Sequence, residues 1–188
     1  MLQNKKNKIA RSSSSRRRVL LLSIIAAFFC LVPPRAFAAP ASPSCSENPD
    51  ARLLDFWLGD WTVTYPGAAG GGSSKVYLAL DQCLLVESWD SGTGLQGENV
   101  FAYNSEDKTW QGLYADNHGR VHIFAGKVTP SSAEFRGPSR GPNGKPVLNR
   151  IKLVRLNSGT VEQSWEKSAD DGKTWTIEFR GQYTRKTP

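Results

Sequence analysis

Three polar residues able to orient or deprotonate a bound molecule, Glu87, Asn99 and Gln163, lie in segments that are otherwise apolar and aromatic. A polar group facing a protein interior costs a few kcal/mol unless it is hydrogen-bonded. Apolar walls with a few convergent polar groups are typical of small-molecule pockets. The glutamate could also serve as a general base. These three residues are therefore the first candidates for a binding site.

Residue alternation predicts strands that turn these side chains inward. Charged and hydroxyl residues indicate the solvent face of each segment, and the candidates lie on the opposite face. In the alternative interpretation they lie at a barrel mouth or satisfy one another and buried water, and a one-residue slip in register would reverse the assignment. The predicted ligand site consists of Glu87 and Trp89 in residues 84–90, Asn99 and Tyr103 in residues 98–103, and Gln163 and Trp165 in residues 160–168.

Alternation with a period of two continues through most of the chain after a short helix expected within residues 50–57, for which Asp50 would be the cap. Short turns rich in Gly, Asn, Asp and Ser favour antiparallel pairing of sequential strands, and no helical crossover segment separates them. An uninterrupted meander of this length favours closure into a barrel over a sandwich. We therefore predict an all-β, antiparallel up-and-down barrel of about nine or ten strands. The predicted strands are 61–65, 75–80, 84–90, 98–103, 109–115, 120–126, 133–137, 147–156, 160–168 and 175–183.

The octet SADDGKTW, residues 168–175, has the spacing Ser-x-Asp-x-Gly-x-Thr-Trp that recurs once per blade in β-propeller sialidases. A propeller needs several four-stranded blades, whereas this chain has one copy and no repeat of blade length. We interpret the octet, with Thr174 in it, as a hairpin turn. The side chains of Ser168 and Asp170 would accept bonds from backbone amides, Gly172 would have a positive φ, and Trp175 would cap the core.

The first 38 residues have the features of a secretory signal peptide. Basic residues precede an apolar run at 19–32, and Ala36-Phe37-Ala38 fits a cleavage site before Ala39. The apolar run is too short for a comfortable membrane span, so an uncleaved anchor is the lesser alternative. Residues 15–20 resemble the twin-arginine export signature. We expect a periplasmic or secreted protein, exported by the Sec or twin-arginine route, with no stable membrane insertion after cleavage.

Cleavage would leave a Pro/Ser-rich lead at 39–49 and a single barrel domain at 50–188. The leader holds eight of the 24 lysines and arginines and none of the 17 acidic residues, so the remaining chain has a net charge of −1. The basic character of the whole chain therefore belongs to the leader. Nothing in the remaining charge favours a nucleic acid as partner.

Two cysteines, Cys45 and Cys83, remain after cleavage, and in an oxidising compartment a disulfide between them is expected. They lack the Cys-x-x-Cys spacing of a redox pair. Of the two histidines, His118 lies in a turn, and His122 shares a face with Arg120, which indicates exposure. We therefore expect neither a metal site nor another cofactor.

Three segments together resemble an exported bacterial family of unknown function that carries Phe-Asp-Phe-Trp-Leu-Gly-x-Trp after its signal peptide. They are LLDFWLGDWTV at 53–63, CLLVESW at 83–89 and SADDGKTWTIEFRGQY at 168–183. The resemblance implies a lipocalin-like, or calycin-like, barrel in which Trp61 plugs one end and Gly59 permits a tight start to the first strand. It implies ligand binding without naming the ligand. Haem-binding nitrobindin-type barrels have a proximal histidine that has no convincing counterpart in this chain. The resemblance therefore does not imply haem binding.

The leading functional hypothesis is an exported, non-catalytic protein that binds a small, partly apolar molecule inside the barrel. One alternative is an envelope protein with a filled barrel that acts through surface contacts, for which the loop at 138–146 is the candidate. The other is an enzyme that acts on a small bound substrate with Glu87 as general base.

Overall fold

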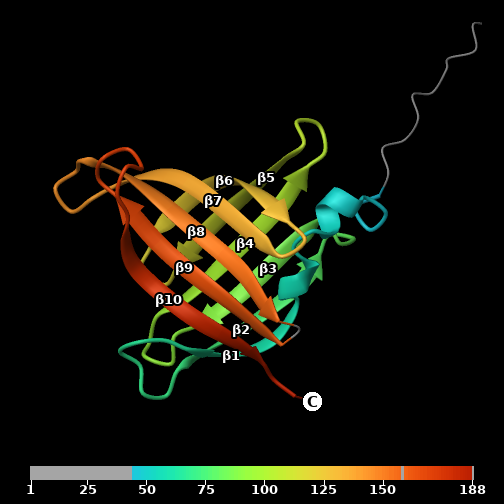
Figure 1. The fold of residues 1–188 in the computed structure, drawn as a ribbon, viewed down its shortest axis with the longest axis horizontal. Coiled ribbons are helices and arrows are strands. Elements are labelled where there is room, and N and C mark those ends of the chain that lie inside the picture. Colours follow the sequence, from blue (N-terminus) through green and yellow to red (C-terminus); the bar gives the residue numbers. More distant parts are fainter. Residues whose placement is uncertain (1–43, 158, 188) are drawn as a thin grey trace, which may run out of the picture. The chain divides into compact units, whose positions relative to one another are not determined.

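The computed structural model describes residues 44–157 and 159–187, so the proposed signal peptide at 1–38 lies outside the described residues. The described chain forms a closed barrel of ten antiparallel strands, in which each strand pairs with the next and β10 pairs with β1 (Figure 1). The predicted all-β up-and-down barrel is confirmed. The strands are β1 (Gly59–Thr64), β2 (Gly72–Ala79), β3 (Leu84–Asp90), β4 (Gln96–Asn104), β5 (Thr109–Asp116), β6 (Val121–Thr129), β7 (Ser132–Arg140), β8 (Pro146–Asn157), β9 (Thr160–Ser168) and β10 (Thr176–Arg185).

The alternation read from the sequence produces these strands because successive side chains point to opposite faces. In β1, Trp61 and Val63 are fully buried, whereas Thr62 and Thr64 are exposed. In β9 the inward positions include Val161 and Gln163. One half of the interior is packed with apolar side chains, among them Phe101, Phe124, Phe135, Ile151 and Leu153.

The segment before β1 closes the packed half through two short 3-10 helices, η1 (Pro49–Arg52) and η2 (Asp55–Trp57). The predicted short N-terminal helix is present as these 3-10 turns, but Asp50 is not its cap: Asn48 is the cap, and its side chain accepts from the Asp50 amide. Leu54 and Trp57 are both fully buried. Their spacing of three places them on one face of a 3-10 turn, whose period is three residues.

Aromatic rings from both chain ends meet at this plug. The Trp57 ring packs edge-on against Phe101 and Tyr183, with centroids 6.1 Å and 6.0 Å away. Trp61 donates its indole N–H to the Trp57 carbonyl at 2.9 Å, and the Arg185 guanidinium lies 4.5 Å from the centre of the Trp61 ring. The first and last strands are thus joined around Trp61.

The expected Cys45–Cys83 disulfide is present and ties the segment before η1 to the turn between β2 and β3. Residues 44–157 and 159–187 contain no helix that is long and apolar enough to cross a membrane.

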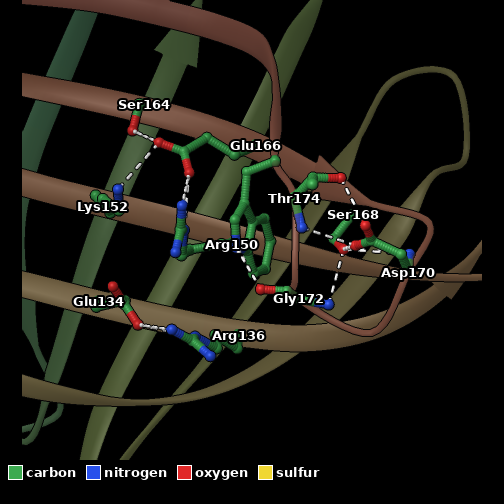
Figure 2. A network of polar contacts seen from close by, with 11 residues as sticks. Glu134, Arg136, Arg150, Lys152, Ser164, Glu166, Ser168, Asp170, Gly172 and Thr174 are labelled. Carbon is green, nitrogen blue, oxygen red and sulfur yellow. Dashed lines mark hydrogen bonds and ion pairs between the residues drawn. The ribbon is translucent and has the colours of Figure 1, made fainter.

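The octet forms the turn between β9 and β10 (Figure 2). Ser168 Oγ accepts from the Gly172 amide at 2.8 Å, and Asp170 Oδ1 accepts from the Thr174 amide at 2.9 Å. Gly172 has a φ of +84°, as its place in the turn predicts. The amide-binding roles of Ser168 and Asp170 therefore agree with the turn interpretation.

Trp175, however, does not cap the core. Its indole N–H donates to the Gly172 carbonyl at 3.0 Å, and its ring stacks on the Arg150 guanidinium, 3.8 Å from the ring centre. A bulge between Ile177 and Phe179 shifts the register of β10, so the alternation predicted from Trp175 onward does not keep one face. Ile177 pairs with outward-facing Glu166, and only from Phe179 does the strand follow the predicted inward face.

The outer side of β7 to β9 carries a network of ion pairs (Figure 2), and two of its arginines, Arg136 and Arg150, lie over the Trp175 ring. Glu166 forms ion pairs with Arg150 and with Lys152, whose Nζ lies 3.2 Å away. It also accepts a hydrogen bond from the Ser164 hydroxyl at 3.0 Å. Glu166 is almost fully covered, although it faces outward. Trp175 is therefore part of an external polar layer that braces the outer surface of the sheet.

Candidate functional site

Four inward side chains lie at one level of the barrel because the strand register aligns them. Glu87 pairs with Asn99, Asn99 pairs with Tyr114, and Tyr114 pairs with His122 across β3, β4, β5 and β6. Directly paired residues in adjacent antiparallel strands have neighbouring side chains on one face. The row therefore presents a carboxyl, a carboxamide, a phenol and an imidazole to the same interior space.

That space is a cavity of about 280 Å³ in the half of the barrel away from the η2 plug. Its walls are mainly aromatic and come from β3, β5, β6, β9 and β10. The rings meet at steep angles, with Tyr114 and Trp165 centroids 5.0 Å apart and Trp89 and Phe179 centroids 5.7 Å apart. The aromatic lining residues are Trp89, Tyr114, His122, Trp165, Phe179 and Tyr183.

Glu87 is the charged group deepest in this cavity, with an exposed fraction of 1%. The Ser74 hydroxyl donates to its Oε1 at 2.8 Å, and the Asn99 amide nitrogen donates to its Oε2 at 2.7 Å. Burial raises the pKa of Glu87 to about 7, although hydrogen bonds to the carboxylate act in the opposite direction. This carboxyl therefore changes charge near neutral pH.

Tyr183 and Gln163 complete the polar end of the cavity. The Tyr183 hydroxyl donates to Gln163 Oε1. Burial raises the pKa of Tyr183 well above its usual value, and the nearby Glu87 carboxylate adds to the shift. Tyr183 consequently stays a neutral hydrogen-bond donor.

Two buried polar atoms of the cavity have no hydrogen-bond partner within residues 44–157 and 159–187. They are Asn99 Oδ1 and His122 Nδ1. Burial lowers the pKa of His122, and the charges of Lys167 and Arg120 lower it further. His122 is therefore neutral at pH 7, and both orphaned atoms are available to a molecule in the cavity.

Two ion pairs lie at the opening of the cavity, and within each pair the two charges neutralise one another. Arg120 Nε lies 2.6 Å from Asp116 Oδ2, which also accepts from the Tyr114 hydroxyl at 3.1 Å. Lys167 Nζ lies 2.9 Å from Glu178 Oε2. Both basic side chains at the opening are thus matched by a carboxylate.

Five of the six residues predicted for the site line this cavity. They are Glu87, Trp89, Asn99, Gln163 and Trp165. The structure places Tyr103 elsewhere, near η1, where its hydroxyl donates to Asp50 Oδ2 at 3.2 Å and its ring lies 5.9 Å from Trp110.

The expectation that His122 is exposed is wrong, because its ring faces inward and stacks on Tyr114 at 6.2 Å. The signal was its place two residues before Phe124, which is buried. The expectation rested on Arg120, which shares this face but lines the cavity with His122, while the apolar residues Val121 and Ile123 on the other face are 58% and 65% exposed. Tyr114, Phe179 and Tyr183 also line the cavity and are not among the residues that the sequence predicts for the site.

Replacing Tyr103 with phenylalanine tests the corrected boundary of the site. We expect only a small loss of stability, because one exposed hydrogen bond to Asp50 disappears. The affinity for any molecule that the barrel binds should change by less than about twofold, as for other substitutions distant from a site. Titration of wild-type and variant protein with the same ligand checks this, and a larger loss of affinity would return Tyr103 to the site.

Comparison with known proteins gives no named relative by sequence. No family model matches the chain, and no curated protein matches it. One solved structure with a similar fold is that of Rv2717c from M. tuberculosis, which has 12% sequence identity and a TM-score of 0.47, with 74% of this chain and 99% of that chain covered. At this level of similarity no property of that protein is transferred to this chain.

Proposed function

We propose that the chain is an exported lipocalin-like protein that binds a small, partly apolar molecule in its barrel and does not transform it. The observation that supports this most strongly is the cavity of about 280 Å³ inside the barrel, lined by aromatic rings and by two buried polar atoms that have no hydrogen-bond partner among the described residues. A purely structural interior would fill that volume, because protein cores are close-packed. Small-molecule pockets combine the same ingredients.

The proposed site consists of Glu87, Asn99 and Gln163 as orienting groups and of Trp89 and Trp165 as walls. Glu87 and Asn99 lie beside one another, joined by the 2.7 Å hydrogen bond. Gln163 lines the same cavity from β9. A molecule in the cavity would thus contact polar groups at its inner end and rings along its sides.

Native mass spectrometry of the exported protein, compared with the denatured mass, tests the proposal directly. An adduct that disappears on denaturation is expected and would begin to identify the molecule. The denatured mass also reports the proposed start at Ala39 and the two-hydrogen loss of the disulfide. A bare native mass together with no binding in a ligand screen would favour the alternative that acts through surface contacts.

The double substitution Glu87→Ala with Gln163→Ala should weaken binding by roughly 30-fold to 100-fold, since each removed group contributes on the order of 1 kcal/mol or more to a buried ligand. The fold should persist, because neither side chain belongs to the apolar cluster of the packed half. Calorimetric titration with the ligand identified by mass measures the effect. Tyr103→Phe is the control, and equal affinity in the double variant and wild type would refute the assignment of these two residues.

A further inference from the structure

We infer that the inner end of the cavity is an ammonium site, and that the ligand is a compact amine whose N–H groups bind Glu87 and Asn99 while its apolar part lies between the aromatic walls. This inference rests on the proposed function and specifies the chemistry of its ligand.

The balance of donors and acceptors around Glu87 favours a ligand that donates. An ionised carboxylate can only accept, so Asn99 must turn its NH₂ group toward Glu87. That orientation leaves Asn99 Oδ1 buried and without a partner in the described chain. The Ser74 hydroxyl already donates to Glu87, and the Tyr183 hydroxyl already donates to Gln163. What remains open beside the carboxylate is an acceptor, which a donor on the ligand can satisfy.

The charge balance points the same way. Glu87 is fully buried, and its neighbours by hydrogen bond are neutral groups. A buried carboxylate without a cation is unfavourable, and a positive charge on the ligand would compensate it. The basic side chains at the opening are engaged with Asp116 and Glu178, and His122 is neutral. Above neutral pH, where Glu87 is ionised, the cavity thus has an uncompensated negative charge at its inner end and matched charges at its opening.

The walls suit a cation as well. Trp89, Trp165, Tyr114 and Phe179 surround the space, and the faces of such rings attract ammonium groups. A carboxylate ligand would instead meet the charge of Glu87, and a hydrocarbon would leave Asn99 Oδ1 unsatisfied. An amine with one ring is of the right size for about 280 Å³.

Three molecules with the same phenyl ring separate these possibilities: phenethylamine, phenethyl alcohol and hydrocinnamate. Their binding can be followed through the fluorescence of Trp89 and Trp165, because both indoles line the cavity. We expect the amine to bind at least about tenfold more tightly than the alcohol, and the acid to bind most weakly. This ranking is measured in the wild-type protein and does not depend on a variant.

Glu87→Gln should remove the advantage of the amine while the alcohol still binds, since the amide keeps the shape and can still accept from Ser74. Glu98→Gln is the matched control, because Glu98 is an adjacent carboxylate on the outer face of β4 that accepts from Ser88. It should keep the preference for the amine.

If the alcohol or the acid binds as tightly as the amine, the ammonium site is refuted while the proposed binding function stands. The same holds if none of the three binds but the native protein carries an adduct that is not an amine. If none binds and the native mass is bare, both proposals fail together.

Discussion

Replacing both Cys45 and Cys83 with serine is expected to lower the free energy of unfolding by about 4 kcal/mol. The disulfide joins residues 38 positions apart, and a closed loop of this length restricts the unfolded chain by about that amount on the chain-entropy model. Without the bridge the unfolded state regains this conformational freedom.

The loss should appear first at the packed end of the barrel. The bridged loop contains the two 3-10 helices, whose Leu54 and Trp57 are fully buried. At the Cys83 end of the bridged loop, Leu80, Asp81 and Gln82 all have positive φ. Non-glycine residues keep this conformation when the neighbouring structure enforces it. In the variant, the two hydrogen bonds from Arg52 to Gln82 still link the two segments.

Chemical denaturation of wild-type and variant protein measures the total effect, and hydrogen exchange locates it. We expect reduced protection of residues 44–57 and 80–83 before any change in β7 to β9. Wild-type protein treated with a reductant serves as the control and should match the variant. A loss below about 1 kcal/mol would show that the unfolded chain gains little freedom, contrary to the model.

The sequence predicted the barrel because period-two alternation and short turns are local signals; the first recurs in ten strands and the second in the connections between them. The same signals predicted the face of each site residue but not its level along the barrel. Tyr103 shows the difference, since it faces inward like Asn99 but lies four residues further along β4, roughly 13 Å away at the rise of a strand. The position of a residue along the barrel axis relative to other strands depends on the register between strands. Alternation within one strand carries no information on that register.

Two other differences come from breaks in local rules. The bulge in β10 changes the face between Ile177 and Phe179, so Trp175 joins the outer layer beside Arg150. On β6, Val121 and Ile123 are exposed, so hydrophobicity there identifies the wrong face. In both cases the tertiary surroundings determine where the side chain lies. The Trp175 indole stacks on the Arg150 guanidinium, and the His122 ring lines the cavity.

Glu87→Gln should make the ligand-free protein more stable relative to wild type as the pH rises. The difference in free energy of unfolding between variant and wild type should be about 3 kcal/mol larger above neutral pH than in acid. Burial raises the pKa of Glu87 from 4.5 to about 7 in the folded state. Between these values the folded state holds a proton that the unfolded state has released, so the free energy of unfolding falls as pH rises through this range. Each pKa unit corresponds to about 1.4 kcal/mol. Glutamine does not titrate, so the variant keeps the free energy of unfolding that the wild type loses through Glu87 over this pH range.

Several neighbouring groups must be separated from this effect. Tyr183 and Tyr114 contact the same space but stay neutral, because their pKa values are raised. The Glu98 carboxylate adds to the rise in the pKa of Glu87 from the outer face. His122 gives a slope of the opposite sign, since its pKa is lowered on folding and the unfolded state binds the extra proton. The difference between wild-type and Glu87→Gln profiles cancels the His122 contribution.

Urea denaturation of both proteins from about pH 4 to about pH 8 measures that difference. It should stay constant in acid, change between about pH 4.5 and pH 7, and level off above this range. Glu98→Gln should show a much smaller change, because that carboxylate is exposed. Parallel profiles for wild type and Glu87→Gln would mean that Glu87 titrates normally and is solvated in the cavity. The buried, uncompensated charge on which the preference for an amine depends would then be absent.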